Sequence, residues 1–204
     1  MRSHTLILDM GGVLMQHNMP ACIARFRQLL CEETADSLLG LSANGEGTAN
    51  SLMARFERGL MDADAFVDAL LAHAKPGTTR ADIVAAWNSM HGGIPAERME
   101  RLGRWKAAGN RLFLLSNNNA LHWVDILSRY DMSVFEHCFL SHCMHCSKPD
   151  AQIYTAVAQY LTAQALPEPY YFVDDIAVNR QAGERLGWIT YSSLEQLAAA
   201  LDLP

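Results

Sequence analysis

Short apolar runs without polar interruption alternate with longer segments of helical spacing over most of the chain. The clearest runs are 6–8, 112–115 and 170–173, and weaker ones lie at 139–140 and 188–190. Such a run is typical of a strand buried on both faces of a parallel sheet. Helices are predicted between and after these strands, at 95–108, 119–129, 150–165, 177–186 and 193–202. The alternation predicts an α/β fold with helices on both faces of the sheet.

The segment that follows the first strand has helical texture and almost no strand signal. Helices are predicted there at 20–30, 48–58, 62–74 and 83–90. We therefore expect residues 1–15 and 91–204 to form a three-layer, Rossmann-like core, and residues 16–90 to form an inserted helical cap sub-domain. Because the insertion leaves directly after the first strand, it is placed to cover a site at the end of that strand.

Composition narrows the class of protein. The chain has 204 residues, half of them apolar, which suits one core with a modest insertion. A formal net charge of -6 without a dense Lys/Arg block disfavours nucleic-acid binding. Five cysteines, an odd number, indicate a reducing compartment. The apolar run before Asp9 is too short for a signal peptide or a membrane span. We expect a cytoplasmic protein, a monomer or weak dimer, that binds neither nucleic acid nor membrane.

Polar side chains collect where the predicted strands end. Asp9 ends the first strand and is followed by Gly11 and Gly12, and the pair Asp174 and Asp175 ends the strand at 170–173. In open α/β sheets ligands bind outside the carboxyl ends of the strands. Asp9 is a candidate metal ligand or covalent nucleophile, the alternative being a helix or turn cap.

Adjacent carboxylates repel each other unless a cation lies nearby, so the pair Asp174 and Asp175 indicates a metal site. Oxygen ligands together with a phosphate substrate favour Mg²⁺. The alternative is a capped turn in which both side chains lie in water.

Two further strand-to-helix junctions carry candidate anion-binding groups. Ser116 and Asn117 follow the second strong strand, where a hydroxyl and amide donors can hold a phosphoryl oxygen. Both residue types also simply suit turns between strands and helices. Lys148 precedes Pro149 and a predicted helix, and its ammonium can neutralise a phosphate and an attacking carboxylate. The alternative there is a solvated loop lysine.

Taken together and in order, these residues resemble the four motifs of the haloacid dehalogenase-like hydrolase superfamily. The matching segments are Asp9-Met-Gly-Gly-Val, Ser116-Asn117, Lys148-Pro149, and Val173-Asp174-Asp175 with Asn179. The match extends over nearly the whole chain. In addition, Phe56-Glu57-Arg58-Gly59 followed by Asp64-Ala65-Phe66 resembles the helical cap of the branch that contains the α-D-glucose-1-phosphate phosphatase.

The resemblance implies a Mg²⁺-dependent phosphatase for a small phosphorylated metabolite, such as a sugar phosphate. Asp9 would attack phosphorus and form an aspartyl-phosphate. The metal would be held by the Asp9 carboxylate, the Gly11 carbonyl and Asp175, with Asp174 nearby. The phosphoryl oxygens would be held by Ser116, the Asn117 amide, and the loop at Gly11 and Gly12. Lys148 would offset the gathered negative charge, so that positioning and fixed charge supply most of the catalysis.

One position departs from the family pattern. Phosphatases of the family usually carry a second Asp two residues after the nucleophile, where this chain has Gly11. Losing a general acid–base costs roughly 10²–10⁴-fold in rate. We therefore expect slow turnover or a preference for good leaving groups. His17 is a candidate substitute acid, the alternative being a solvated loop histidine.

Two other functions are compatible with the absence of the second Asp. A 2-haloacid dehalogenase also lacks it, but needs no Mg²⁺ and no paired carboxylates after the last motif strand, so Asp174 and Asp175 favour the phosphatase. A degenerate, non-catalytic member would bind a phosphometabolite without turning it over.

Two remaining clusters are open to more than one interpretation. The stretch 137–146 is dense in Cys and His, and Cys143-x-x-Cys146 has metal-ligand spacing without a second distant pair. We expect loop residues beside the site, with a structural zinc or an oxidation-sensitive pair as alternatives. Four arginines of the insertion are candidates to meet an anionic substrate, or else belong to solvated helix faces. They are Arg25, Arg27, Arg55 and Arg58.

Overall fold

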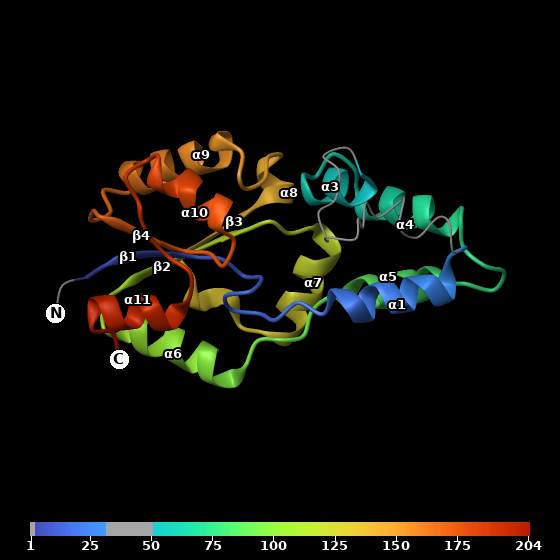
Figure 1. The fold of residues 1–204 in the computed structure, drawn as a ribbon, viewed down its shortest axis with the longest axis horizontal. Coiled ribbons are helices and arrows are strands. Elements are labelled where there is room, and N and C mark those ends of the chain that lie inside the picture. The colour runs from blue at the N-terminus through green and yellow to red at the C-terminus, as the bar shows by residue number, and fades with distance from the viewer. Residues whose placement is uncertain (1–2, 32–50) are drawn as a thin grey trace.

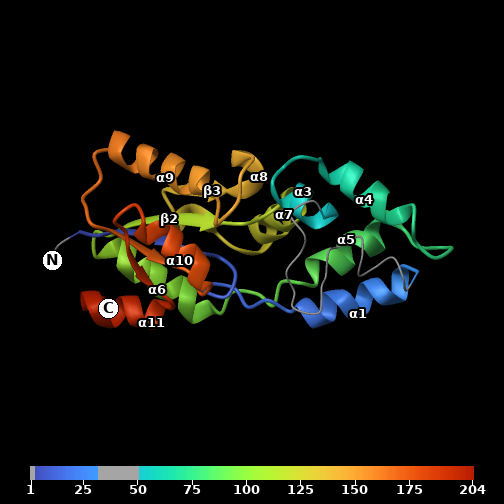
Figure 2. The same ribbon diagram turned by 45° about the horizontal axis from the view of Figure 1, so that its top comes forward.

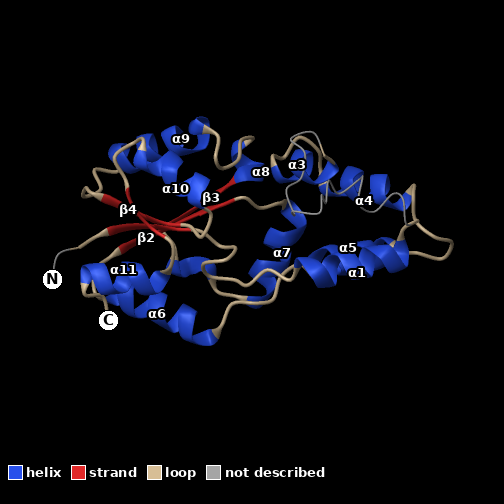
Figure 3. Ribbon diagram, viewed as in Figure 1, coloured by secondary structure: helices blue, strands red, loops and turns tan. Residues whose placement is uncertain are grey.

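The fold is built on one sheet of five parallel strands, and the computed structural model describes residues 3–31 and 51–204. The strand order is β3-β2-β1-β4-β5. Figure 3 shows the strands in red with helices in blue on either side. The strands are β1 (Thr5–Leu8), β2 (Arg111–Ser116), β3 (His137–Leu140), β4 (Tyr170–Val173) and β5 (Ile189–Tyr191). Leu8 is paired with Leu114 on one side and with Val173 on the other. The chain therefore leaves β1 and β4 at the same edge of the sheet, which brings Asp9 beside Asp174.

Helices cover both faces of this sheet, as the uninterrupted apolar strands predict (Figures 1 and 2). Alternate strand residues point to opposite faces, so Leu6 and Leu8 pack in one apolar cluster and Ile7 in the other. The first cluster is covered by α6 (Ala96–Ala107), α7 (Ala120–Arg129) and α11 (Leu194–Leu201). The second is covered by α9 (Ala151–Ala163) and α10 (Ala177–Glu184). This is a three-layer, Rossmann-like α/β fold.

Among the residues that the structure describes, four more helices form a group that we call the helical lobe. They are α1 (Met19–Leu29), α3 (Leu52–Glu57), α4 (Ala63–Leu71) and α5 (Arg80–Asn88). They surround a separate apolar cluster in which the Phe56 and Phe66 rings stack at 4.2 Å and the Phe66 and Trp87 rings lie 4.8 Å apart. Figure 1 shows the lobe at the end of the molecule opposite to both termini. Part of the predicted helix 48–58, residues 48–50, lies outside the described residues.

The chain enters and leaves the lobe through two segments that run side by side. His17 and His91 form an antiparallel bridge, and the Gly92 N–H donates to the Gln16 carbonyl at 2.8 Å. The connections therefore support each other beside the end of β1. Within residues 3–31 and 51–204, no helix has both the length and the apolar character needed to cross a membrane.

Local capping sets where the lobe helices begin. The prediction started one helix at residue 83, where the apolar spacing becomes regular, but α5 begins at Arg80. Thr79 and Asp82 form a reciprocal capping box there, which satisfies backbone donors of the first turn. A short helix that was not predicted, α8 (Ser141–Met144), follows β3 directly. It lies in the stretch expected to be loop, and its first residue, Ser141, contacts the helical lobe.

Candidate active site

Asp9 is held rigidly at the end of β1. Its side chain is buried, with the residue only 6% exposed. The carboxylate atom Oδ1 accepts a hydrogen bond from the Met10 N–H at 2.6 Å and lies 2.8 Å from the Lys148 ammonium. These two donors orient the carboxylate, as a nucleophile or a metal ligand requires.

Asp174 and Asp175 have different surroundings although they are adjacent. Asp174 is fully buried and its carboxylate accepts from Lys148 Nζ at 2.6 Å and from Asn179 Nδ2 at 3.1 Å. Asp175 is exposed. Ligand atoms of Asp9, Asp174 and Asp175 all lie within 4.8 Å of one another. The carboxylates of the first and fourth motifs therefore converge closely enough to share one cation.

The loop that carries Lys148 is hydrogen-bonded to the side chain of Asn117, which follows β2. The Asn117 side chain donates to the Lys148 carbonyl at 2.9 Å and accepts from the Lys148 N–H at 2.8 Å. This side-chain amide is engaged within the protein, so an anion contact at position 117 falls to the main-chain N–H. Ser116, which ends β2, is buried at 2% exposure, and its hydroxyl makes a long contact of 3.3 Å to the Asn117 carbonyl.

The electrostatics of this group favour an added cation. Burial raises the pKa of Asp9 to about 7, with Lys148 opposing the shift and Asp174 adding to it. Burial lowers the pKa of Lys148, but its carboxylate neighbours outweigh that effect, and the net pKa is raised. Three carboxylates and one ammonium leave surplus negative charge. A set of carboxylate oxygens suits a hard divalent ion such as Mg²⁺, so the residues present fit that metal.

The two glycines after Asp9 are needed for different steric reasons. Gly12 has φ 72, and a Cβ there would fall 2.1 Å from Asp175 Oδ2. A Cβ at Gly11 would fall 1.9 Å from His17 Nε2. The His17 ring therefore occupies the space into which the usual second Asp would project. The sequence could not show this, because the two residues are brought together only by the turn between them.

The sequence also matches the model of a known protein family. The family described as haloacid dehalogenase-like hydrolase matches residues 4–187. This chain belongs to that family. The hydrolase is also similar to solved structures over almost its whole length. The family enzyme BT-2542 from Bacteroides thetaiotaomicron, crystallised with magnesium and inorganic phosphate, is 25% identical with a TM-score of 0.77, and 93% of each chain is covered.

Other solved structures have the same fold. A HAD-like family hydrolase from Porphyromonas gingivalis is 24% identical with a TM-score of 0.79, and 98% of each chain is covered. The L-2-haloacid dehalogenase RSc1362 is 18% identical with a TM-score of 0.60, and the alignment covers 93% of this hydrolase and 86% of that chain. At these identities the likeness shows the fold alone.

Sequence reasoning missed the contacts between the helical lobe and the core. Ser141 Oγ accepts from the Asn118 N–H at 2.9 Å and donates to the Glu57 carbonyl at 2.5 Å. For Arg58 the sequence allowed two alternatives, contact with an anionic substrate or a solvated helix face. Its side chain instead contacts Ser147 and Asp150. The conformational freedom of Gly59, next to Arg58, was the one local sign of close backbone approach.

The Cys/His stretch offers no metal site of comparable geometry. Within the described parts of the chain, the carboxylates of Asp9, Asp174 and Asp175 are the one set of His, Cys, Asp or Glu side chains placed to hold an ion. Cys143 and Cys146 are both free thiols. His137 stacks on the Tyr160 ring at 4.8 Å, so packing accounts for it.

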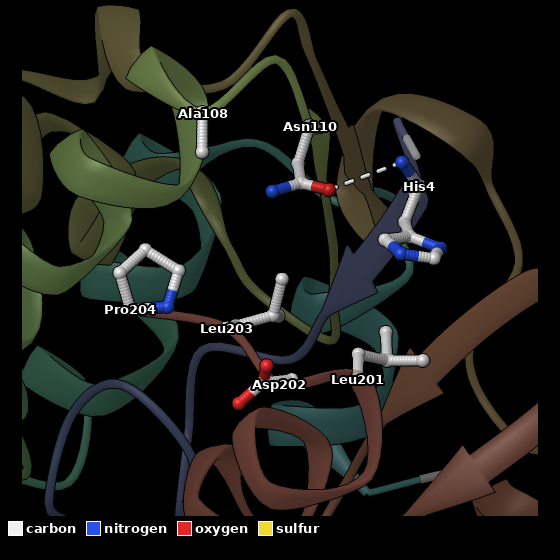
Figure 4. A pocket seen from close by; sticks show the side chains of 7 residues that line it. All are labelled: His4, Ala108, Asn110, Leu201, Asp202, Leu203 and Pro204. Carbon is white, nitrogen blue, oxygen red and sulfur yellow. Dashed lines mark hydrogen bonds between the residues drawn. The ribbon is translucent and has the colours of Figure 1, made fainter. Parts of the chain in front are cut away.

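A cavity of about 350 Å³ lies away from these residues. Figure 4 shows its lining, with the His4 N–H donating to Asn110 Oδ1 at 3.0 Å, and with Leu201 and Leu203 nearby. His4 and Asn110 directly precede β1 and β2, so the cavity lies at the amino ends of the strands. The candidate site lies at the opposite, carboxyl ends, where ligands of this fold class bind.

Proposed function

We propose that this hydrolase is a Mg²⁺-dependent phosphatase for a small phosphorylated metabolite. The observation that carries the proposal is the convergence of the Asp9, Asp174 and Asp175 ligand atoms within 4.8 Å, beside the buried ammonium of Lys148. The similarity to BT-2542, crystallised with magnesium and inorganic phosphate, supports it. In this proposal residues 16–90 are the cap, and residues 1–15 and 91–204 are the core.

Each residue has a role that follows from its position. Asp9 is the nucleophile, since its carboxylate is rigid and ends a buried strand. Its attack forms an aspartyl-phosphate as the bond between phosphorus and the leaving-group oxygen breaks, and water then cleaves this intermediate to inorganic phosphate and the free Asp9 carboxylate. Lys148 neutralises charge as the phosphoryl group approaches Asp9. The phosphoryl oxygens bind Ser116, the main-chain N–H of Asn117, and the loop at Gly11 and Gly12.

The metal would be held by the Asp9 carboxylate, the Gly11 carbonyl and Asp175. When bound, Mg²⁺ draws charge from the phosphoryl oxygens and offsets the surplus negative charge of the site. Asp174 is saturated by Lys148, Asn179 and the Ile176 N–H. It therefore acts mainly by holding Lys148 in place.

Gly11 and His17 shape the preference for the leaving group. Glycine moves no proton. The His17 ring fills the space of the missing carboxyl, but burial lowers the pKa of His17 and so disfavours the protonated form that would act as the acid. The enzyme therefore favours leaving groups that depart without protonation, such as acyl, aryl or anomeric sugar phosphates. Turnover of an alkyl phosphate at least equal to that of an aryl phosphate would contradict this preference.

Phosphate release from a panel of sugar, aryl and alkyl phosphates, measured with and without Mg²⁺, tests the function. We expect release that needs the metal and is abolished by Asp9→Asn. Halide release from a 2-haloacid without metal would support a dehalogenase instead. Binding of phosphate esters with no turnover in either assay would support a non-catalytic member of the family.

A further inference from the structure

The loop that carries Lys148 is held from two sides. From the core, Asn117 clasps the Lys148 main chain through two hydrogen bonds. From the helical lobe, Arg58 binds the residues that flank the Lys148-Pro149 pair. Its Nε donates to Ser147 Oγ at 2.9 Å, and its second terminal nitrogen donates to Asp150 Oδ2 at 3.1 Å. The Arg58 side chain therefore contacts the residues on both sides of Lys148 and Pro149.

The turn that carries Arg58 is seated closely against the same part of the core. Gly59 has φ 63, and a Cβ there would fall 2.1 Å from the His142 carbonyl oxygen. On the other side of Arg58, the Glu57 carbonyl accepts from Ser141 Oγ at 2.5 Å. The guanidinium is thus aimed from a turn whose main chain is in contact with the core on both sides. Figure 1 shows this region where α3 meets α8.

We propose that Arg58 is a positioning residue, through which docking of the helical lobe sets the Lys148 ammonium between Asp9 and Asp174. The inference rests on the phosphatase function proposed above. Lys148 Nζ lies 2.8 Å from one carboxylate and 2.6 Å from the other, so its placement leaves little tolerance. A misplacement of about 1 Å costs up to about 100-fold in rate.

The ion pair of Arg58 and Asp150 is accessible to solvent, so its loss can change the position of the Lys148 loop without unfolding the protein. The Arg58 and Asp150 side chains are 30% and 46% exposed. Ion pairs that are this accessible contribute little to stability, because water and salt screen them. Removing Arg58 therefore leaves the protein folded while the Lys148 loop loses its contacts with the Arg58 guanidinium. The contact of His145 Nδ1 with the main-chain carbonyl at position 58, 3.3 Å long, is retained.

The test compares Arg58→Ala, Arg58→Lys and a matched control, all assayed on an aryl phosphate with saturating Mg²⁺. Arg101→Ala is the control, because it removes an accessible Arg–Glu pair of 2.9 Å elsewhere in the core. We expect Arg58→Ala to lower kcat about 10-fold with little change in KM, since Lys148 acts on charge that develops during phosphoryl transfer. Arg58→Lys restores part of kcat by reforming one contact, and Arg101→Ala behaves as the wild type.

A second measurement does not depend on activity. Hydrogen exchange of a peptide spanning 145–150 should be faster in Arg58→Ala than in the wild type or in Arg101→Ala. Unchanged exchange overturns the inference, whether or not the wild type releases phosphate. A rise in KM at constant kcat also overturns it, because Arg58 would then bind substrate directly. If the wild type is inactive, the phosphatase function fails, while faster exchange still supports the role of Arg58.

Discussion

Lys148→Met is the substitution with the sharpest structural consequence. The ammonium lies between the carboxylates of Asp9 and Asp174, and the Lys148, Asp9 and Asp174 side chains are 2%, 9% and 0% exposed. Methionine keeps most of the side-chain volume but removes the charge. Two buried carboxylates then face each other without a cation. Hydrogen bonds remain from the Met10 N–H to Asp9, and from Asn179 and the Ile176 N–H to Asp174.

The expected cost depends on pH. Breaking a buried ion pair by removing one partner costs about 3–5 kcal/mol. Asp9 already has a pKa raised from 3.8 to about 7. A carboxyl whose folded pKa is raised lowers stability as pH rises from its unfolded pKa of 3.8 to its folded pKa of about 7, because only the unfolded chain is ionised in that range. Without Lys148 the pKa of Asp9 rises further, so the loss of stability is larger at about pH 8 than at about pH 6.

Urea unfolding followed by circular dichroism, in EDTA at about pH 6 and about pH 8, measures this difference. Lys106→Met is the control, because Lys106 is exposed and donates to the Ser133 carbonyl at the surface. We expect the control to lose less than about 1 kcal/mol at either pH. Equal losses for Lys148→Met at the two pH values would refute the electrostatic reasoning, and a loss as small as the control's would refute the buried ion pair itself.

Three further predictions follow from the close contacts of the two glycines and from the raised pKa of Asp9. Gly11→Asp forces the His17 ring to move and costs about 1 kcal/mol, which His17→Ala relieves in a double-mutant cycle of urea unfolding. A coupling below about 0.3 kcal/mol would show that the ring does not fill that space. Gly12→Ala lowers Mg²⁺ affinity about 10-fold in calorimetric titration by displacing Asp175, and unchanged affinity would contradict that close approach. Mg²⁺ binds more tightly at about pH 8 than at about pH 6, since a proton on Asp9 competes, and Asp9→Asn removes this dependence.

The parallel sheet and the core of the site were predictable because they depend on local pattern. Uninterrupted apolar runs identified the strands, and polar residues at their ends identified Asp9 and Asp174 as neighbours at one edge. The register that pairs Leu8 with both Leu114 and Val173 confirms that arrangement. The start of α5 was missed, since the Thr79 and Asp82 capping box acts before the apolar spacing begins.

The contacts that complete the site were not predictable from any local pattern. Asn117 clasps Lys148 across 31 residues, and Arg58 reaches Ser147 across 89. His17 fills the space beside Gly11 because of the turn that joins them. Each contact depends on the relative placement of separate elements.

The sequence by itself determined which candidate residues share one edge of the sheet, since the apolar period sets strand burial and the strand ends set where polar groups emerge. The tertiary structure alone decided how those groups are oriented. Hydrogen bonds and ion pairs between distant segments require distances of about 3 Å, and only packing of the sheet, the α8 region and the helical lobe sets distances at that scale.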